Sequence, residues 1–350
     1  MRPSSSPAPQ PRSAPPGGGG GALRGVAAGG ITVAPMAAPP LDTADSAEAA
    51  VPAGTGTAAG MAAGMAAGTT TNTAAASVVE IRPSPRWRAI DFAELWRYRE
   101  LAFFLAWRDI KVRYKQTVLG IAWALLQPLM TMLVFVVIRS LAGLEPTGTA
   151  PGPVLVFAAV LPWQFFQTSV SQSGQSLVGA SNLISKVYFP RLIVPLAALG
   201  PALVDFAISL GLMAALMLWY GVPVTPGVLL LPPLTVGLIV AAFGFGTGLA
   251  GLTVAYRDFR YVIPFFLQMG MLLSPVGYEL DRVAAKMPEG WFWVYFLNPM
   301  AGLIGAFRGA LLGEPIPWGG LAISMSVAAA MLVAGSYYFR SVEKRFADIV

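Results

Sequence analysis

The chain has 350 residues, of which 55% are hydrophobic and only 11% are charged, whereas a soluble domain usually carries about 25% charged residues. This leaves too little polar surface to cover a soluble globular protein of that length, so the composition predicts a protein surrounded by lipid. The sequence contains no cysteine and no histidine. It therefore excludes disulfides, zinc sites, and catalysis by Cys or His nucleophiles or by a His general base.

Residues 1–85 are predicted to form a disordered, low-complexity tail. They consist largely of Ala, Gly, Pro, Ser and Thr, with GGGGG at 17–21 and GMAAGMAAG at 60–68. Such a segment cannot bury enough apolar surface to offset the entropy of ordering it. We expect no signal peptide here, because no apolar core follows the early arginines. A tail that binds a partner is the alternative interpretation.

Residues 86–117 are predicted to form an amphipathic helix that lies in the headgroup plane of a membrane. Within DFAELWRYRELAFFLAWRDIKVRYK (91–115), large apolar residues recur at spacings of 4, 7, 4, 3 and 4 and fall on one stripe. These residues are Phe92, Trp96, Phe103, Trp107, Ile110 and Tyr114. Basic residues lie on the other side, as in an interfacial anchor beside anionic lipid. The spacing favours this anchor over a helix that also touches a cytoplasmic partner.

The region 118–339 contains the predicted membrane spans. A spanning helix needs about 20 apolar residues, and six stretches qualify: 118–139, 153–173, 192–220, 227–254, 261–277 and 319–339. The apolar stretch 291–312 contains Asn298, Pro299 and Arg308 and follows a polar segment. We interpret 278–312 as a re-entrant or interfacial element on the outer side. The predicted fold is an all-α integral membrane protein with six spans, and seven or eight spans are the alternatives.

The distribution of basic residues predicts the orientation. Eight Lys and Arg lie between residues 86 and 115, and seven more lie in the other predicted inner loops and at the C-terminus, against four on the outer side. Because Lys and Arg concentrate on the cytoplasmic side of membrane proteins, both termini are predicted to be cytoplasmic, with 340–350 as a cytoplasmic tail. This asymmetry explains the net charge of +6 without nucleic acid.

The loop between the second and third predicted spans is expected in the cytoplasm. Ser181 and Asn182 can cap a short helix that runs through Tyr188, and Pro190 then ends it. A helix presented in this way could dock a partner. A simple helical connection is the interpretation that the residues alone favour.

Ionisable groups are scarce within the predicted spans. Asp205 is the one acid that we place well inside a span, whereas ion-driven carriers keep several ionisable groups at mid-membrane. The scarcity therefore indicates an energy source outside this chain. We interpret Asp205 as a residue near a helix packing contact rather than as an ion site.

Amides and aromatic residues are the more frequent polar and flat groups of the spans. Amides form hydrogen bonds with sugar hydroxyls, and aromatic rings stack on sugar C–H faces. Interhelical hydrogen bonds and interfacial aromatic belts use the same residues, and the residue types alone favour that role for most of them. We nevertheless hypothesise that parts of two helix faces line a pathway. The candidates are Trp163, Phe165, Phe166 and Gln167 on the second span, and Tyr261, Phe265 and Gln268 on the fifth.

The sequence shows no nucleotide site. The pattern GxxxxGK[ST] does not occur, and the Gly-rich stretch GFGTGLAG at 244–251 lies in an apolar span, where small residues serve helix packing. We predict no catalytic residue and no metal ligand in this chain.

Four long segments resemble one family. RDIKVRYKQTVLGIAWALLQPL (108–129), SNLISKVYFPRLIVP (181–195), YRDFRYVIPFFLQMGMLLSPVGY (256–278) and LNPMAGLIGAFRGALLG (297–313) are similar to the permease subunits of ABC transporters that export polysaccharides and polyol phosphates, the ABC type-2 permeases. The resemblance covers roughly 91–350 in the same order. The N-terminal residues fall outside it.

The resemblance implies a homodimer that encloses a channel for a lipid-linked glycan in the bacterial inner membrane. Two copies of a separate ATPase subunit would bind ATP and Mg²⁺ on the cytoplasmic side, so the chain itself would hold no cofactor. The segment before the first span would be the interface helix, and 278–312 would contain short outer gate helices. A coupling helix would lie in 181–191, with Ser181, Asn182, Leu183, Ile184, Lys186, Val187, Tyr188 and Arg191 as the candidate coupling residues.

The resemblance favours export of O-antigen or capsule polysaccharide. A permease for teichoic acid, a glycolipid or a drug is the nearest alternative. A membrane-embedded glycosyltransferase is a more distant one, because such an enzyme needs ionisable groups near the membrane surface. Glu279, Asp281 and Glu289 form the one cluster available for that chemistry.

Overall fold

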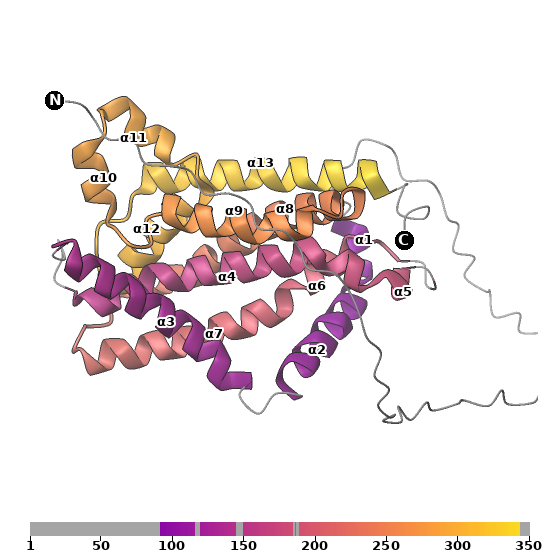
Figure 1. Ribbon diagram of the computed structural model, residues 1–350, viewed down its shortest axis with the longest axis horizontal. Helices are drawn as coiled ribbons and strands as arrows, with labels where there is room; N and C mark the ends of the chain where they lie inside the picture. The colour runs from indigo at the N-terminus through magenta and orange to yellow at the C-terminus, as the bar shows by residue number, and fades with distance from the viewer. Residues whose placement is uncertain (1–91, 116–119, 145–149, 185, 187–188, 344–350) are drawn as a thin grey trace, which may run out of the picture. The chain divides into compact units, whose positions relative to one another are not determined.

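The computed structural model describes residues 92–115, 120–144, 150–184, 186 and 189–343 (Figure 1). The predicted tail 1–85 and the last residues of the predicted C-terminal tail lie outside these ranges. So do Val187 and Tyr188, and nothing is described of the side chains of Phe92 and Asn182. All regular structure in the described ranges is helical, as expected for a chain whose backbone groups must pair without water.

The first half of the described chain contains seven helices, three of them no longer than six residues. These are α1 (Phe92–Arg97), α2 (Arg99–Lys115), α3 (Gly120–Leu141), α4 (Gly152–Gly179), α5 (Ser181–Ile184), α6 (Ile193–Ala197) and α7 (Leu199–Trp219). The second half contains η1 (Pro226–Leu230), α8 (Leu231–Ala255), α9 (Phe259–Leu273), α10 (Leu280–Lys286), α11 (Glu289–Tyr295), α12 (Pro299–Leu312) and α13 (Trp318–Glu343).

Within the described residues, five helical stretches are long and apolar enough to cross a membrane. They are Ala122–Leu141, Gly152–Gly179, Ile193–Trp219, Pro226–Ala255 and Trp318–Glu343, and they correspond to five of the six predicted spans. The other prediction, 261–277, corresponds to α9, which has 15 residues. A helix of that length is about 22 Å long, shorter than the roughly 30 Å of a bilayer core.

Helix α4 forms the centre of the bundle. Nearly every residue from Val154 to Phe166 is buried, because α4 is apolar on all its faces. It packs against α7, α8, α12 and α3. Aromatic rings interlock in this core: Phe165 lies 5.3 Å from Phe206, and Phe166 lies 5.7 Å from Phe245, measured between ring centroids.

The segment that we interpreted as a re-entrant or interfacial element, 278–312, forms α10, α11 and α12. Figure 1 shows all three at the end of the bundle where α13 begins. The residues of α12 from Pro299 to Leu311 are all buried, because α12 packs among α13, α4 and α8. The Asn298 side chain caps α12 by accepting a hydrogen bond from the Met300 backbone. Helix α12 is therefore enclosed by protein and does not lie at an interface with lipid.

The two ends of the described chain meet at the opposite end of the bundle. Arg340 at the end of α13 lies 3.9 Å from the Glu94 carboxylate of α1. The Arg191 guanidinium, just before α6, donates a hydrogen bond of 2.7 Å to the Glu343 backbone carbonyl. Figure 1 shows α1, α5 and the last turn of α13 together at this end, which we call the α5 end.

Helices α8 and α13 make the most extensive pair contact, and small residues permit it. A Cβ atom at Gly244 would lie 2.6 Å from the Leu332 backbone nitrogen, and one at Gly335 would overlap the Gly244 carbonyl oxygen. In lipid, helices associate through such close van der Waals packing, because apolar side chains gain little by leaving an apolar solvent. The GFGTGLAG stretch thus serves helix packing, as predicted.

We predict that Gly335→Ala destabilises the bundle, because the added methyl group must push α13 away from the α8 backbone. The expected result is a lower midpoint of thermal unfolding for the purified protein in detergent. Gly211→Ala on α7 is the matched control, since a Cβ there has no heavy atom within 4 Å and Ala is favoured over Gly in helices by roughly 0.5–1 kcal/mol. An unchanged midpoint for Gly335→Ala would show that the contact tolerates separation.

Candidate functional site

Helix α1 and the N-terminal part of α2 present aromatic rings of the predicted stripe to the surroundings, and the other face of α2 packs on α6 and α7. Trp96 and Phe103 are each 70% exposed, and Trp107 is also exposed. Arg99 lies over the Trp96 ring at 5.2 Å and Lys111 over the Trp107 ring at 5.3 Å. This combination of outward rings and cations suits the headgroup region of a membrane.

The C-terminal part of the predicted stripe has a different environment. Ile110 and Tyr114 are half-buried, because α2 turns this part toward α7. A Cβ atom at Gly200 would lie 2.7 Å from the Ala106 Cβ, so the two backbones approach closely. The stripe is therefore exposed at its N-terminal end and packed against protein at its C-terminal end.

Asp205 of α7 binds the last turn of α2. Its Oδ2 lies 2.6 Å from the Arg113 Nη2, and its Oδ1 accepts a hydrogen bond from the Tyr114 hydroxyl. Burial, together with this hydrogen bond, raises the pKa of Tyr114 well above its ordinary value, so its proton stays in place. The sequence predicts Asp205 near a helix packing contact, but it does not identify Arg113 as the partner. A lone acid in a span requires a counter-ion, and that requirement is the signal that could have found the pair.

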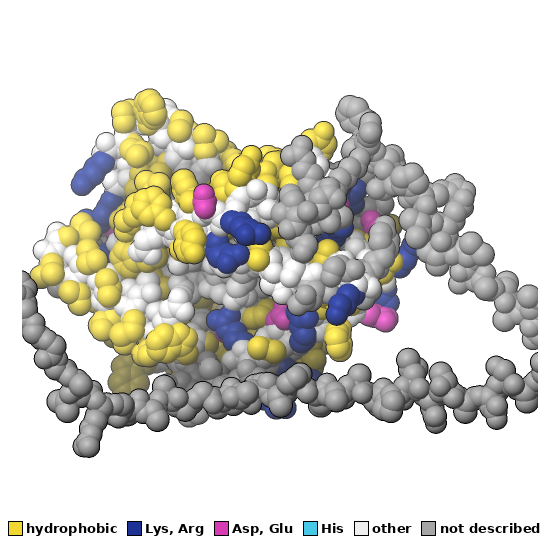
Figure 2. All heavy atoms as spheres, turned by 45° about the vertical axis from the view of Figure 1, so that its right-hand side comes forward, with side chains coloured by type: hydrophobic (Ala, Val, Ile, Leu, Met, Phe, Trp, Pro, Cys, Tyr) yellow, Lys and Arg dark blue, Asp and Glu magenta, His cyan; other side chains and the backbone are white. Residues whose placement is uncertain are grey.

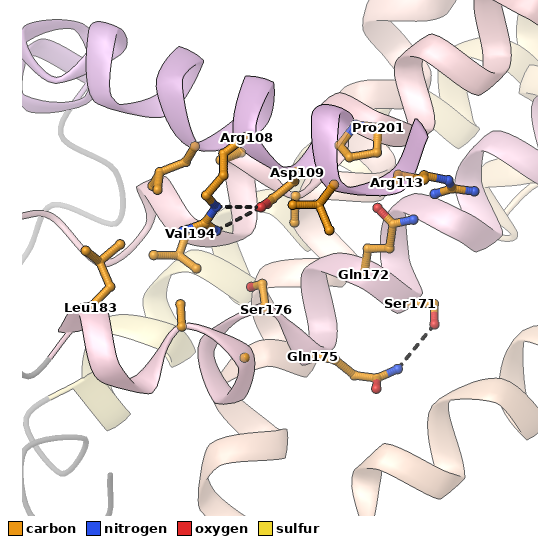
Figure 3. A pocket seen from close by; sticks show the side chains of 16 residues that line it. Arg108, Asp109, Arg113, Ser171, Gln172, Gln175, Ser176, Leu183, Val194 and Pro201 are labelled. Atoms are coloured by element: carbon orange, nitrogen blue, oxygen red, sulfur yellow. Dashed lines mark hydrogen bonds and ion pairs between the residues drawn. The ribbon is translucent and has the colours of Figure 1, made fainter. Parts of the chain in front are cut away.

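A cavity of about 490 Å³ lies between α2 and α4 and is also lined by α5, by α6 and by Ala198 and Pro201 at the start of α7 (Figure 3). Its polar lining comes from α2 and α4, and Leu105, Val112, Leu183 and Val194 are among its apolar walls. The polar lining residues are Arg108, Asp109, Arg113, Ser171, Gln172, Gln175 and Ser176. Arg108 and Asp109 form an ion pair of 2.8 Å, and Arg113 is paired with Asp205. Because each guanidinium has a carboxylate beside it, the cavity carries little excess charge.

The candidate coupling residues lie beside this cavity. Helix α5 contains Ser181, Leu183 and Ile184 and ends four residues before Tyr188, where the predicted helix was to end. Leu183 lines the cavity, and Lys186 is exposed. Most of the Lys and Arg side chains visible in Figure 2 lie toward the α5 end.

The candidate pathway residues do not form one surface within the protein. Trp163, Phe165 and Phe166 are at most 5% exposed, and the Trp163 indole nitrogen donates a 2.9 Å hydrogen bond to the Gln167 side chain. On α9, in contrast, Tyr261 is 79% and Phe265 is 60% exposed, and Gln268 is exposed beside them. The α9 candidates can therefore meet another molecule directly, whereas the aromatic residues of α4 can do so only after the helices rearrange.

The other end of the bundle contains a buried ionic cluster. The Glu279 carboxylate forms ion pairs with Arg139 of α3 and Arg282 of α10, each with a nitrogen–oxygen distance of 2.9 Å. Arg139 also donates to the backbone carbonyls of Gly277 and Leu144. Local sequence could not reveal this cluster, because Arg139 and Glu279 are 140 residues apart. The pairing stabilises the turn between α9 and α10 against the end of α3.

Glu279 is also one of the three acids that were the candidates for glycosyltransferase chemistry. Glu279 is buried and held between two guanidinium groups, and Asp281 is exposed on α10. The side chain of Glu289 lies outside the description. Ion pairing with Arg favours the charged form of a carboxylate, so Glu279 has the chemistry of a structural ion pair rather than that of a proton donor.

The comparisons with known proteins agree on one family. The model of the family described as ABC-2 type transporter matches residues 100–312. The O-antigen export system permease protein RfbA of Myxococcus xanthus is 28% identical over 258 residues, which are 73% of this chain and 98% of that protein. Two proteins of the same name from Klebsiella pneumoniae are each 24% identical over 246 residues, which are 69% of this chain and 92% of theirs.

We predict that Glu279→Gln lowers the stability of the protein, because it leaves two guanidinium groups beside a neutral amide. Breaking a buried ion pair costs about 3–5 kcal/mol, so the midpoint of thermal unfolding in detergent should fall by several degrees. Asp281→Asn removes a charge from an exposed position two residues away and should change stability by only about 0.5 kcal/mol. Equal effects of the two variants would contradict a structural role for the cluster.

Proposed function

The chain belongs to the ABC-2 type transporter family, and from this premise we propose that it is the membrane-spanning subunit of an ATP-driven exporter of lipid-linked O-antigen polysaccharide. The observation that carries the proposal is its similarity to the O-antigen permease RfbA of Myxococcus xanthus, which extends over 98% of that protein. A match of that extent covers nearly the whole relative rather than one shared motif.

We propose six crossings of the bacterial inner membrane, with both termini in the cytoplasm. Arg340 near the end of α13 lies beside Glu94 of α1, and an even number of crossings accounts for this proximity. Helix α9 would be the fifth crossing. Its 15 residues are short for an average bilayer, so it would need a locally thinner membrane or help from the residues that follow it.

We propose that a separate ATPase subunit docks at the α5 end. There α2 and α5 lie on two sides of the 490 Å³ cavity, and the relatively high density of basic residues supports a cytoplasmic location. ATP and Mg²⁺ would bind to the partner, because the chain lacks the phosphate-binding pattern GxxxxGK[ST]. Helix α5 would act as the coupling helix and α2 as the interface helix.

We propose that two copies of the chain enclose the pathway and that α9 contributes to its wall. Tyr261, Phe265 and Gln268 supply rings and an amide on the exposed surface of α9. A glycan moves through a channel most easily where its contacts are weak, repeated and rapidly released. Such contacts suit an uncharged, sugar-binding surface better than the paired charges at either end of the bundle.

The proposal is tested by expressing the chain with its cognate ATPase subunit, in a strain that lacks its own O-antigen permease. We expect a purified complex that hydrolyses ATP and restores O-antigen to the cell surface. An ATPase variant without its P-loop lysine is the control and should leave the glycan inside. Robust ATP turnover by the chain alone, or a complex that restores no O-antigen, would contradict the proposed function.

For the pathway, we predict that Phe265→Ala slows export at an unchanged protein level, because an exposed ring is lost without opening a cavity. Phe165→Ala should instead lower the protein level, since removing a buried Phe costs about 3–5 kcal/mol. Tyr337→Ala, at an exposed aromatic position on α13, is the control for a ring that faces the surroundings elsewhere. Export and protein level are measured together in the same cells. Normal export by Phe265→Ala would place the pathway away from α9.

A further inference from the structure

A carboxylate within an apolar span is costly and therefore needs a specific role. Asp205 is only 16% exposed and lies on α7, inside the stretch Ile193–Trp219 that is long enough to span a membrane. Its partners, Arg113 and Tyr114, both come from the last turn of α2. We propose that Asp205 is a positioning residue that joins the interface helix α2 to α7, so that a displacement of α2 moves α7 with it.

The contacts of Asp205 are suited to transmitting force. Both carboxylate oxygens are engaged, one by the Arg113 guanidinium and the other by the Tyr114 hydroxyl. Hydrogen bonds to ionised groups are roughly twice as strong as those between neutral groups. Two side chains on adjacent residues of α2 also fix the direction of approach, because neither can move without straining the other.

A second contact holds α2 against the start of α7. Gly200, five residues before Asp205, lets the α2 backbone approach so closely that a Cβ at this position would lie 2.7 Å from the Ala106 Cβ. Ala106 and Tyr114 are about two turns apart on α2. Helix α2 is thus attached to the start of α7 at two separated points, which resists rotation as well as translation.

The link between α2 and α4 is weaker. The cavity of about 490 Å³ lies between them (Figure 3). Across it, the Gln172 amide can accept a 2.6 Å hydrogen bond from Arg113 while it donates to the Ala198 carbonyl. Gln172 is neutral, so its contact with Arg113 lacks the second charge that Asp205 supplies. The side of α2 that faces α4 therefore has both a weaker bond and space to move.

The two proposed docking elements are consequently attached to different helices. Helix α5 follows α4 after a single residue, Ala180, and packs on its end, whereas α2 is held by α7. This inference rests on the proposed function, since it assigns separate routes for motion from one ATPase: from α5 to α4, and from α2 through Asp205 to α7. The cavity would allow α2 to move relative to α4.

Asp205→Asn tests the link that Asp205 forms between α2 and α7, because asparagine keeps the shape of the side chain and can still form a hydrogen bond with Tyr114. In the reconstituted complex with its ATPase, we expect the amount of glycan exported per ATP to fall about fivefold or more, the lower range of coupling between sites. ATP turnover and complex formation should be retained. Adding Arg113→Gln to Asp205→Asn should cause little further loss, because the two residues act as one unit. Glu100→Gln, at an exposed position on α2, is the control for loss of a charge.

Distance measurements test the motion directly. The chain contains no cysteine, so spin labels can be placed in pairs at Lys111→Cys with Leu203→Cys, and at Lys111→Cys with Gly179→Cys. With one labelled protomer in each complex, addition of ATP and Mg²⁺ should change the α2–α4 distance and leave the α2–α7 distance unchanged. With Asp205→Asn, the α2–α7 distances should broaden.

The outcomes separate the two proposals. A wild-type chain that binds no ATPase would contradict the proposed function. If the wild-type complex exports glycan and the Asp205→Asn complex exports as much glycan per ATP, the proposed role of Asp205 is contradicted while the proposed function stands. The proposed role of Asp205 is also contradicted if the α2–α7 distance changes with ATP as much as the α2–α4 distance does. That measurement uses the chain with Asp205 unchanged.

Discussion

Enclosure of α4 by other helices is the constraint on which the described bundle depends. Its residues from Val154 to Leu161 are almost entirely without exposed surface, and the helices around it must supply that cover. In lipid the hydrophobic effect does not drive one apolar helix onto another. Close packing has to do so, through interlocked rings such as Phe165 and Phe206 and through the glycine contacts between α8 and α13.

Charged groups enclosed by the helices obey a related constraint. Where water is excluded, a charge persists only beside an opposite charge or several hydrogen bonds. Glu279 therefore forms ion pairs with Arg139 and Arg282. Asp205 forms an ion pair with Arg113 and accepts a hydrogen bond from Tyr114. Each cluster joins helices that are distant in sequence. The cluster of Glu279 stabilises the turn between α9 and α10, whereas that of Asp205 joins a surface helix to a membrane-spanning one.

These features give a physical picture of the membrane subunit of an exporter. The surface near α5 presents α2 and α5 on two sides of a cavity, where we propose that the partner docks. The core around α4 is densely packed. The exposed rings of α9 form the surface that we propose lines a pathway completed by a second copy. Energy would enter at one surface and be used as relative motion of helices.

The sequence by itself determined the helical class, most of the spans and the family. Length and apolar composition decide whether a helix can cross a bilayer, and the four family-like segments are contiguous in the chain. Periodicity placed Trp107 and Tyr114 on one stripe. It did not predict that Tyr114 is half-buried, because the neighbour that covers it comes from α7. The tertiary structure alone decided that Trp163 and Phe165 lie in the core while Phe265 is exposed. It also decided which arginine pairs with Asp205 and with Glu279. Residue types set which groups need partners, but a partner 91 or 140 residues away is chosen by how the helices pack, and no local pattern records that choice.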